Sequence, residues 1–465
     1  MKTDVSSQLV VNIDRKRYTA LSGLWKSPYA SVMSEEIDWY SNTDESILAV
    51  VLHDYTDNDY AAVVSMRDLS GRFRAVDVQV SFVTVAAAVE WLTSTICSRS
   101  ESGEKHHRQG DEVPSLNLFD PVVPQERLHP GFVHLANDLA FLPGRSIIRE
   151  LMPHYHDIDG NFVSQFQSSG FDARTWELYL FTYFKEEELF LDRTHRSPDF
   201  IVSKFDRSVA VEAVIVGRQL DNPPKRGIVK APKSATEIQE LQKDLMPIRF
   251  GSPLNSKLRK KYWRSPHVRG LPLIFAIADF HDDQSMLWSS TALGNYLYGY
   301  RHEHYYDESG TLVVKPIKIN SHKFGDKKIP SGFFFLPGAE NVSAVLFSAS
   351  GTISKFNRLG RQAGFAHPGV RMFRRGTLHD HDPNASVPHI FSYEVDETSE
   401  ETWGEGLSMF HNPKAKFPVP RELFPSIAHH YFEDGHIRSV LPEIFVYSST
   451  TIHMIARDDG GEENA

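Results

Sequence analysis

Two carboxylates that lie one hairpin apart are the residues best placed in this chain to carry out chemistry. Asp199 follows Pro198 at the start of one apolar run, and Glu212 lies in the middle of the next run, VAVEAVIV. Because side chains alternate across a strand, Glu212 projects from a segment that is otherwise apolar on both faces. A buried carboxylate is costly unless it is paired, hydrogen-bonded or bound to a cation. Pairing of residues 198–206 with 208–216 would bring the two carboxylates together, and Mg²⁺ would then offset their repulsion.

The pair also has a structural interpretation. In that interpretation Asp199 caps the turn after Pro198, and Glu212 pairs with one of the many arginines of the chain. The elements that must position the two acids bear on this choice. The sequence predicts, in order, a helix, three short strands, a second helix and an apolar central strand, with the segments FDARTWELYLFTYFKEE, ELFLDRT, PDFIVSKFD, VAVEAVIV, NSKLRKKYW and LPLIFAIADF.

This order of elements, with its acids, resembles the core of the PD-(D/E)xK nuclease superfamily, which includes many restriction and repair endonucleases. The resemblance covers roughly residues 172 to 280 and implies an α/β (mixed α+β) fold with a restriction-endonuclease-like αβββαβ core. Glu177 in TWELYL matches the acid of the first helix, Asp199 the motif aspartate and Glu212 the second acid. The resemblance implies a Mg²⁺-dependent (or Mn²⁺-dependent) endonuclease that hydrolyses phosphodiester bonds. Asp199 and Glu212 would hold the metal, and Glu177 would complete its shell or orient a bound water.

One position departs from the superfamily pattern, because Val214 stands where the motif has a lysine. Lys257, on the next helix, is the expected replacement, and Lys204 is the other candidate. Lys257 and Lys261 are four residues apart and would share one side of that helix. The structural alternative is a solvated basic helix face. Val214 also favours a second function, a catalytically degenerate nuclease-fold domain that binds nucleic acid or a partner protein.

The segment around this helix is strongly basic. Residues 218–269 hold thirteen Lys and Arg against four acids, a local charge of +9 in a chain whose net charge is -10. Such clusters neutralise phosphates, so we expect nucleic acid as the partner, DNA rather than RNA, with Arg259, Lys260 and Lys261 contacting it. The alternative is a flexible solvated loop, which the composition of DNPPKRGIVKAPKSATE also suits.

The 465-residue chain is too long for a single core. We predict a β-rich N-terminal domain over 1–98, a polar linker over 99–115 and the nuclease-like core over 116–284. A C-terminal extension over 285–465 would pack on the core and end in a disordered tail, 457–465.

Other features limit the remaining function classes. Cys97 is the only cysteine, which excludes intramolecular disulfides and cysteine-rich zinc sites. The chain shows neither a signal-peptide pattern nor a run of 18 apolar residues, so we expect a cytoplasmic protein without a membrane partner, and leave a homodimer open.

The histidines support a third function. The chain has 22 of them, and His379 and His381 in LHDHDP would share a strand face with metal-binding potential. A metal-binding module that uses the C-terminal histidines is therefore a further alternative.

Overall fold

The computed structural model describes residues 9–23, 26–113, 115–218 and 234–456. It confirms a mixed α/β protein and divides the chain into two compact units. The first unit comprises Met1–Gln167, Phe356–Val370 and Val395–Glu400, and the second comprises Ser168–Lys355, Arg371–Glu394 and Glu401–Ala465. This division differs from the predicted domain ranges, because residues 116–167 belong to the first unit. The tail 457–465 lies outside the described residues.

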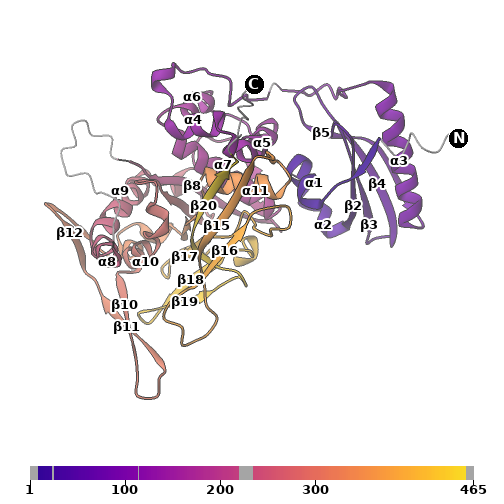
Figure 1. Cartoon of the computed structure of the whole chain (residues 1–465). Coiled ribbons are helices and arrows are strands. Elements are labelled where there is room, and N and C mark those ends of the chain that lie inside the picture. Colours follow the sequence, from indigo (N-terminus) through magenta and orange to yellow (C-terminus); the bar gives the residue numbers. More distant parts are fainter. Residues whose placement is uncertain (1–8, 24–25, 114, 219–233, 457–465) are drawn as a thin grey trace, which may run out of the picture. The chain divides into compact units, whose positions relative to one another are not determined.

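The first unit contains a five-stranded antiparallel sheet in the order β1-β2-β3-β4-β5 (Figure 1). Its strands are β1 (Val10–Asn12), β2 (Ser34–Asn42), β3 (Ile47–Asp54), β4 (Asp59–Arg67) and β5 (Phe73–Phe82). Helix α3 (Val85–Ser102) packs its apolar side on this sheet, and its N-terminus is capped by the side chain of Thr84. The helix therefore extends into the segment predicted as a linker. The remaining helices of this part are α1 (Arg15–Ser22), α2 (Ala30–Met33), α4 (Pro130–Asn137), α5 (Leu142–Leu151) and α6 (Phe162–Gln167).

The second unit is built on an eight-stranded mixed sheet in the order β19-β18-β17-β14-β9-β8-β7-β6. Strands β6, β7 and β8 form an antiparallel meander, whereas β8, β9 and β14 run parallel to one another. The core segment reads α7 (Phe171–Glu186), β6 (Phe190–Asp192), β7 (Phe200–Lys204), β8 (Arg207–Val216), α8 (Ala235–Lys243), α9 (Leu245–Lys260) and β9 (Leu273–Asp279). The predicted order of elements is thus present, with α8 as an added helix.

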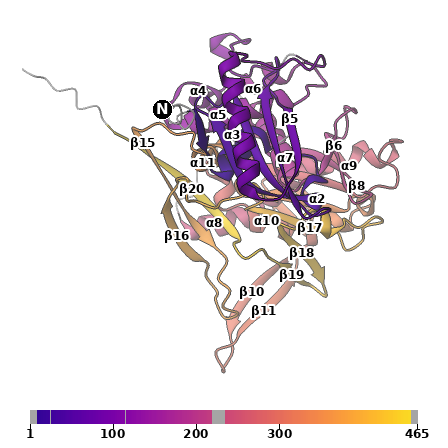
Figure 2. The ribbon, with the colours of Figure 1, turned by 90° about the vertical axis from the view of Figure 1, so that its right-hand side faces the viewer.

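The C-terminal part of the second unit completes this sheet rather than only packing on it. Its strands β14 (Ala344–Ser348), β17 (Leu407–His411), β18 (Ala428–Glu433) and β19 (His436–Val440) continue the sheet beyond β9. A separate three-stranded sheet has the order β16-β15-β20, with β15 (Val370–Leu378), β16 (His389–Glu394) and β20 (Val446–Ile455). Two hairpins, β10 (Tyr300–Tyr306) with β11 (Leu312–Lys318) and β12 (Ser321–Phe324) with β13 (Lys327–Pro330), stand apart from both sheets, and β10–β11 projects in both views (Figure 2). Helix α10 (Ser290–Tyr298) also belongs to the second unit, and α11 (Ile353–Gln362) begins in it and continues into the first unit.

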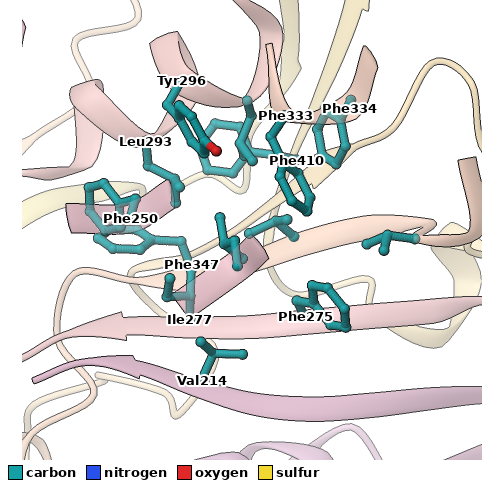
Figure 3. Close-up of a cluster of buried hydrophobic side chains, with 14 of the residues drawn as sticks. Val214, Phe250, Phe275, Ile277, Leu293, Tyr296, Phe333, Phe334, Phe347 and Phe410 are labelled. Atoms are coloured by element: carbon teal, nitrogen blue, oxygen red, sulfur yellow. The ribbon is translucent and has the colours of Figure 1, made fainter. Parts of the chain in front are cut away.

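The main core of the second unit lies between this sheet and helices α9 and α10. Val214, Ile277 and Phe347, from β8, β9 and β14, belong to one apolar cluster with Phe250 of α9 and Tyr296 of α10 (Figure 3). All seven residues of β9 are buried, as expected of a central parallel strand covered on both faces. Val214 is 3% exposed and belongs to this apolar core, so a lysine at its position would replace packed hydrocarbon with a charge.

Candidate active site

Glu212 is a buried carboxylate in the middle of β8, on the strand face that also carries Val214. The ammonium group of Lys257 on α9 contacts its Oε1, and the Tyr262 hydroxyl donates a hydrogen bond of 2.6 Å to the same oxygen. The ion-pair partner of Glu212 is therefore Lys257 of the predicted helix, and not an arginine as in the structural interpretation. These two contacts offset the cost of burying the carboxylate, and they bring the expected replacement lysine onto the predicted acid.

Asp199 lies directly before β7, and its Oδ2 accepts a hydrogen bond of 2.7 Å from the backbone N–H of Ala213. The ladder between β7 and β8 ends with Phe200 opposite Val211. Continued by two residues, it would place Pro198 opposite Ala213, but β7 begins only at Phe200. The Asp199 carboxylate takes the place of the missing strand, which holds it beside the backbone of Glu212.

The electrostatics of Asp199 show that negative charge is in excess here. Burial, followed by the charges of Glu212 and Glu177, raises the pKa of Asp199 from 3.8 to about 7, although the Ala213 N–H and Lys257 oppose the change. Within the described part of the chain, no cationic side chain forms an ion pair with Asp199. A carboxyl group whose pKa is raised to near neutrality by burial and by neighbouring acids is a frequent feature of functional sites.

Glu177 is held away from direct ligation by its own helix. Arg174, one turn earlier on α7, donates hydrogen bonds of 2.7 and 2.8 Å to its two carboxylate oxygens. Across the described residues, no group of three or more His, Cys, Asp or Glu is arranged to hold a metal ion. The expected metal shell of Glu177, Asp199 and Glu212 is therefore not assembled, because Arg174 occupies the oxygens that Glu177 would need.

The two remaining acids still fit a magnesium ion by their chemistry. Mg²⁺ is bound in proteins by one or two carboxylates, and water and phosphate oxygens fill its other positions. Asp199 and Glu212 supply hard oxygen donors, and the raised pKa of Asp199 reports a position where added positive charge would be stabilising. Lys257 offsets only one of the negative charges around the pair.

The predicted phosphate contacts lie at the C-terminal end of α9, just beyond Lys257. Arg259, Lys260 and Lys261 are exposed there, and the ammonium of Lys260 lies 5.8 Å from the ring of Tyr262. Four other basic residues of the predicted cluster, Lys225, Arg226, Lys230 and Lys233, lie outside the described residues.

Lys204 is not available as the replacement lysine. Its ammonium donates to Glu188 Oε2 at 3.2 Å and to the backbone oxygen of Glu187 at 3.3 Å, at the opposite end of β7 from Asp199. Of the two lysine candidates, Lys257 is thus the one that contacts a predicted acid, Glu212.

Two residues that support this site escape the sequence pattern. Tyr262 reads as a member of the apolar helix face, yet its hydroxyl binds Glu212 and its pKa is raised by burial and by that carboxylate. His267 stacks on His195 with ring centroids 3.8 Å apart, and its Nε2 lies 2.9 Å from the backbone oxygen of Ser197. The latter contacts tie the segment before Asp199 to the loop before β9, a long-range relation that no local spacing indicates.

A second polar cluster lies at the carboxyl end of β9. Asp279 is 1% exposed and faces the same side of the sheet as Val216 and Glu212. Its Oδ1 lies 2.7 Å from Nδ1 of His281, and its charge favours the protonated form of Arg249, whose pKa burial lowers. The signal in the sequence is the run DFHDD directly after an apolar strand, a place where ligand-binding residues gather in α/β sheets.

His379 and His381 lie side by side, with ring centroids 4.9 Å apart, and each also bonds to a protein group. Nδ1 of His379 lies 3.0 Å from the Tyr447 hydroxyl, and Nε2 of His381 lies 2.9 Å from the backbone oxygen of Glu443. In the part of the chain that the structure covers, no third ligand joins them. The metal-binding module that uses these histidines therefore lacks a ligand set there.

Comparison of the chain with protein-family models, with curated proteins and with solved structures found no match. None of the helices among the described residues is long and apolar enough to cross a membrane.

Proposed function

We propose that this protein is a metal-dependent nuclease that hydrolyses phosphodiester bonds of nucleic acid on a restriction-endonuclease-like core. The observation that carries the proposal is the contact of Lys257 with Glu212. This contact brings the ammonium group of a lysine on α9 to Glu212. In the superfamily motif, the lysine would instead come from position 214, two residues after that acid. The order of α7, β6, β7, β8, α9 and β9 and the position of Asp199 beside β8 support the same proposal.

Each residue has a distinct task in this proposal. Asp199 and Glu212 hold Mg²⁺ or Mn²⁺, which when bound lowers the pKa of a water and offsets charge on the phosphate. Lys257 orients Glu212 and places positive charge beside the phosphate oxygens of the substrate. Tyr262 fixes the same carboxylate. Glu177, held by Arg174, acts on Asp199 through its charge and not as a direct ligand.

A second function is favoured by a specific observation. Val214 is packed in the core, and Lys257 with Tyr262 satisfies Glu212 without any metal. A domain that has lost catalysis but still binds nucleic acid or a partner protein would show this arrangement. The two functions share the basic end of α9 and differ in whether Asp199 and Glu212 bind a cation.

Cleavage and metal binding, measured side by side, test the proposal. Supercoiled, linear and single-stranded DNA and structured RNA are incubated with the protein in Mg²⁺, in Mn²⁺ and in a chelator. Mn²⁺ binding is followed by its electron paramagnetic resonance signal. We expect metal-dependent cleavage that Asp199→Asn and Glu212→Gln abolish, together with weaker Mn²⁺ binding. Lys204→Ala, a lysine change on the same hairpin but away from the site, serves as the matched control.

The outcomes separate the two functions. Wild-type protein that binds nucleic acid, binds no Mn²⁺ and cleaves none of these substrates would establish the binding domain and end the nuclease proposal. Equal activity of Lys204→Ala and wild type, with both acid variants inactive, would support it.

A further inference from the structure

The β12–β13 hairpin is a short ribbon with two chemically different faces. Its register pairs His322 with Ile329, Lys323 with Lys328, and Phe324 with Lys327. Because side chains alternate across the ribbon, Lys323 and Lys328 share one face and His322 and Ile329 share the other. On the inner face His322 is buried and Ile329 is partly buried, whereas Phe324 and Lys327, at the tip of that face, are exposed. Lys323 and Lys328 of the outer face are exposed as well.

The inner face fastens the hairpin to the start of α9. His322 is 1% exposed, its Nδ1 lies 2.9 Å from the backbone oxygen of Lys243, and its Nε2 lies 2.7 Å from Oγ of Ser331. The backbone N–H of Lys323 donates a 2.9 Å hydrogen bond to Oδ1 of Asp244.

Ile329 extends the same anchor into the main core. It packs against that core above Gly251 of α9, where a Cβ atom would come within 2.8 Å of its side chain. The hairpin is thus held against the same helix that carries Lys257, as the labels β12, α8 and α9 in Figure 1 also show.

The outer face and the tip carry charge that the protein itself leaves unmatched. Lys323, Lys327 and Lys328 are exposed, and none of them forms an ion pair with any described residue. Lys323 and Lys328 stand directly opposite each other, and like charges in that position destabilise a strand pair. Asp326 is the only acid in the hairpin turn. An unfavourable cationic pair in a chain of net charge -10 suits a polyanion as its partner.

Phe324, at the tip beyond the anchored residues, adds an exposed apolar group on the face opposite to Lys323 and Lys328. It is 46% exposed and lies beside Lys327 in the register. Lysines that flank an exposed aromatic side chain suit the backbone and groove of a duplex, since a two-stranded ribbon fits the major groove and apolar side chains can insert between base steps.

We propose that the β12–β13 hairpin is a second contact for double-stranded DNA, separate from the candidate active site. This proposal rests on nucleic acid being the ligand in the proposed function. From Asp244, at the start of α9, to Lys257 the helix rises by about 20 Å. That length corresponds to roughly six base pairs of duplex. The hairpin would hold the backbone on one side of the scissile phosphate while α9 sets its distance from Lys257.

Equilibrium binding of the wild-type chain and its variants to a fluorescent DNA duplex tests the hairpin. The measurements are made over a salt series in a chelator, so that cleavage does not contribute. For Lys323→Glu with Lys328→Glu, we expect at least about tenfold weaker binding and a salt slope smaller by about 2, since two phosphate contacts are lost. For Phe324→Ala we expect weaker binding with the salt slope unchanged, because no phosphate contact is removed.

The matched control is Arg371→Glu with Arg438→Glu, two exposed arginines of the same unit that change the charge by the same amount. Equal loss of binding in this control would overturn the hairpin contact, because net charge would then explain the effect. Unchanged affinity and slope in the lysine variant would also overturn it, as would tighter binding of single strands than of duplex. Circular dichroism and thermal unfolding confirm that each variant is folded.

Different results would contradict the hairpin contact and the nuclease function. If the wild-type chain cleaves DNA and the lysine variant binds it unchanged, only the hairpin contact fails. If no cleavage occurs but the lysine variant loses duplex binding with the expected change in slope, the hairpin contact stands and the catalytic proposal fails.

Discussion

The second unit contains two clusters of buried charge that are built in opposite ways. One of them, which we call the closed network, comprises Lys355, Arg374, Glu401 and Glu405. Lys355 contacts Glu401 at 2.7 Å, and Arg374 contacts Glu405 at 2.6 Å and Glu401 at 3.4 Å. These side chains are between 0% and 10% exposed. Each carboxylate there has a cationic partner in direct contact. The closed network is matched in charge and sealed from water.

The open cluster comprises Glu177, Asp199, Glu212, Arg174 and Lys257, and it is neither matched nor sealed. Lys257 is 24% exposed on its side chain, and Asp199 is half-buried with one backbone N–H as its described hydrogen-bond donor. Three acids face two cations, and burial together with the charges of Glu212 and Glu177 raises the pKa of Asp199. The difference teaches that buried charge by itself does not mark a functional site. Under the proposed function, unmatched charge with access to solvent is what would allow a metal ion and a phosphate to bind there.

The largest effect we expect is on the stability of the closed network. Lys355→Met removes the partner that lies 2.7 Å from the buried Glu401, and loss of one partner of a buried ion pair costs about 3–5 kcal/mol. We therefore expect a clear fall in the denaturation midpoint. Lys257→Met, at the more exposed pair, should cost less. Chemical denaturation of both variants measures the comparison, and equal losses would contradict the distinction between a sealed and an open cluster.

The next effect is on catalysis and belongs to the open cluster alone. If Lys257 stabilises charge in the transition state, Lys257→Met should lower metal-dependent cleavage by on the order of 10²–10³-fold and leave DNA binding nearly unchanged. Val214→Lys in the same variant should restore part of the activity, because residues 212 and 214 share a strand face. Single-turnover cleavage measures both. Activity of Lys257→Met equal to wild type would remove the lysine from the mechanism.

The pH dependence of stability should separate the clusters further. Asp199 has an ordinary pKa of 3.8, which we take for the unfolded chain, and a pKa of about 7 in the folded protein. Between these pH values the folded chain therefore holds more protons than the unfolded chain. The contribution of this group to stability is therefore largest at low pH and falls as pH rises from about 4 to about 7. Asp199→Asn should show a flatter profile over this window. Denaturation midpoints at a series of pH values provide the measurement.

Metal binding should show the opposite pH dependence at the same residue. A cation needs the ionised carboxylate, so Mn²⁺ affinity should rise with pH up to about 7 and become constant above it. Calorimetry in buffers of different ionisation enthalpy would count the proton released. A profile that is flat from pH 5 to about 7 would show that Asp199 is not a ligand.

The smallest effect concerns one hydroxyl in each cluster. Tyr262 donates to Glu212 in the open cluster, and Arg374 donates to the Tyr393 hydroxyl at 3.2 Å in the closed network. Tyr262→Phe and Tyr393→Phe should each cost about 1 kcal/mol of stability. Only Tyr262→Phe should also slow cleavage, by less than about tenfold, since it loosens the carboxylate without removing it. A cleavage defect in Tyr393→Phe of similar size would show that the effect arises from stability.

Local pattern accounts for the part of the site that lies within one hairpin and one helix. Alternation in VAVEAVIV predicts that Glu212 and Val214 share a face, and the position of Asp199 before β7 follows from the short connection to β8. The contact of Arg174 with Glu177 was also within reach, because residues three apart on a helix are neighbours. These relations depend on backbone geometry alone, which is why spacing predicts them.

Contacts between segments that are distant in the sequence could not be predicted from the spacing of residues. The extension of the sheet by β14, β17, β18 and β19, and the closed network between Lys355, Arg374 and Glu401, join residues that no spacing connects. The sequence pattern places Tyr262 on the apolar face of the helix, and only the tertiary structure shows that its hydroxyl donates to Glu212.

By itself, the sequence determined which residues could carry charge into the core and on which face of a strand or helix each would lie. The tertiary structure decided which of those charges are matched. Lys257 could have faced solvent instead of Glu212, and Glu177 could have lacked its contact with Arg174. The choice depends on the free energy of removing each charge from water, and the partners that offset that cost are brought together only when distant elements pack.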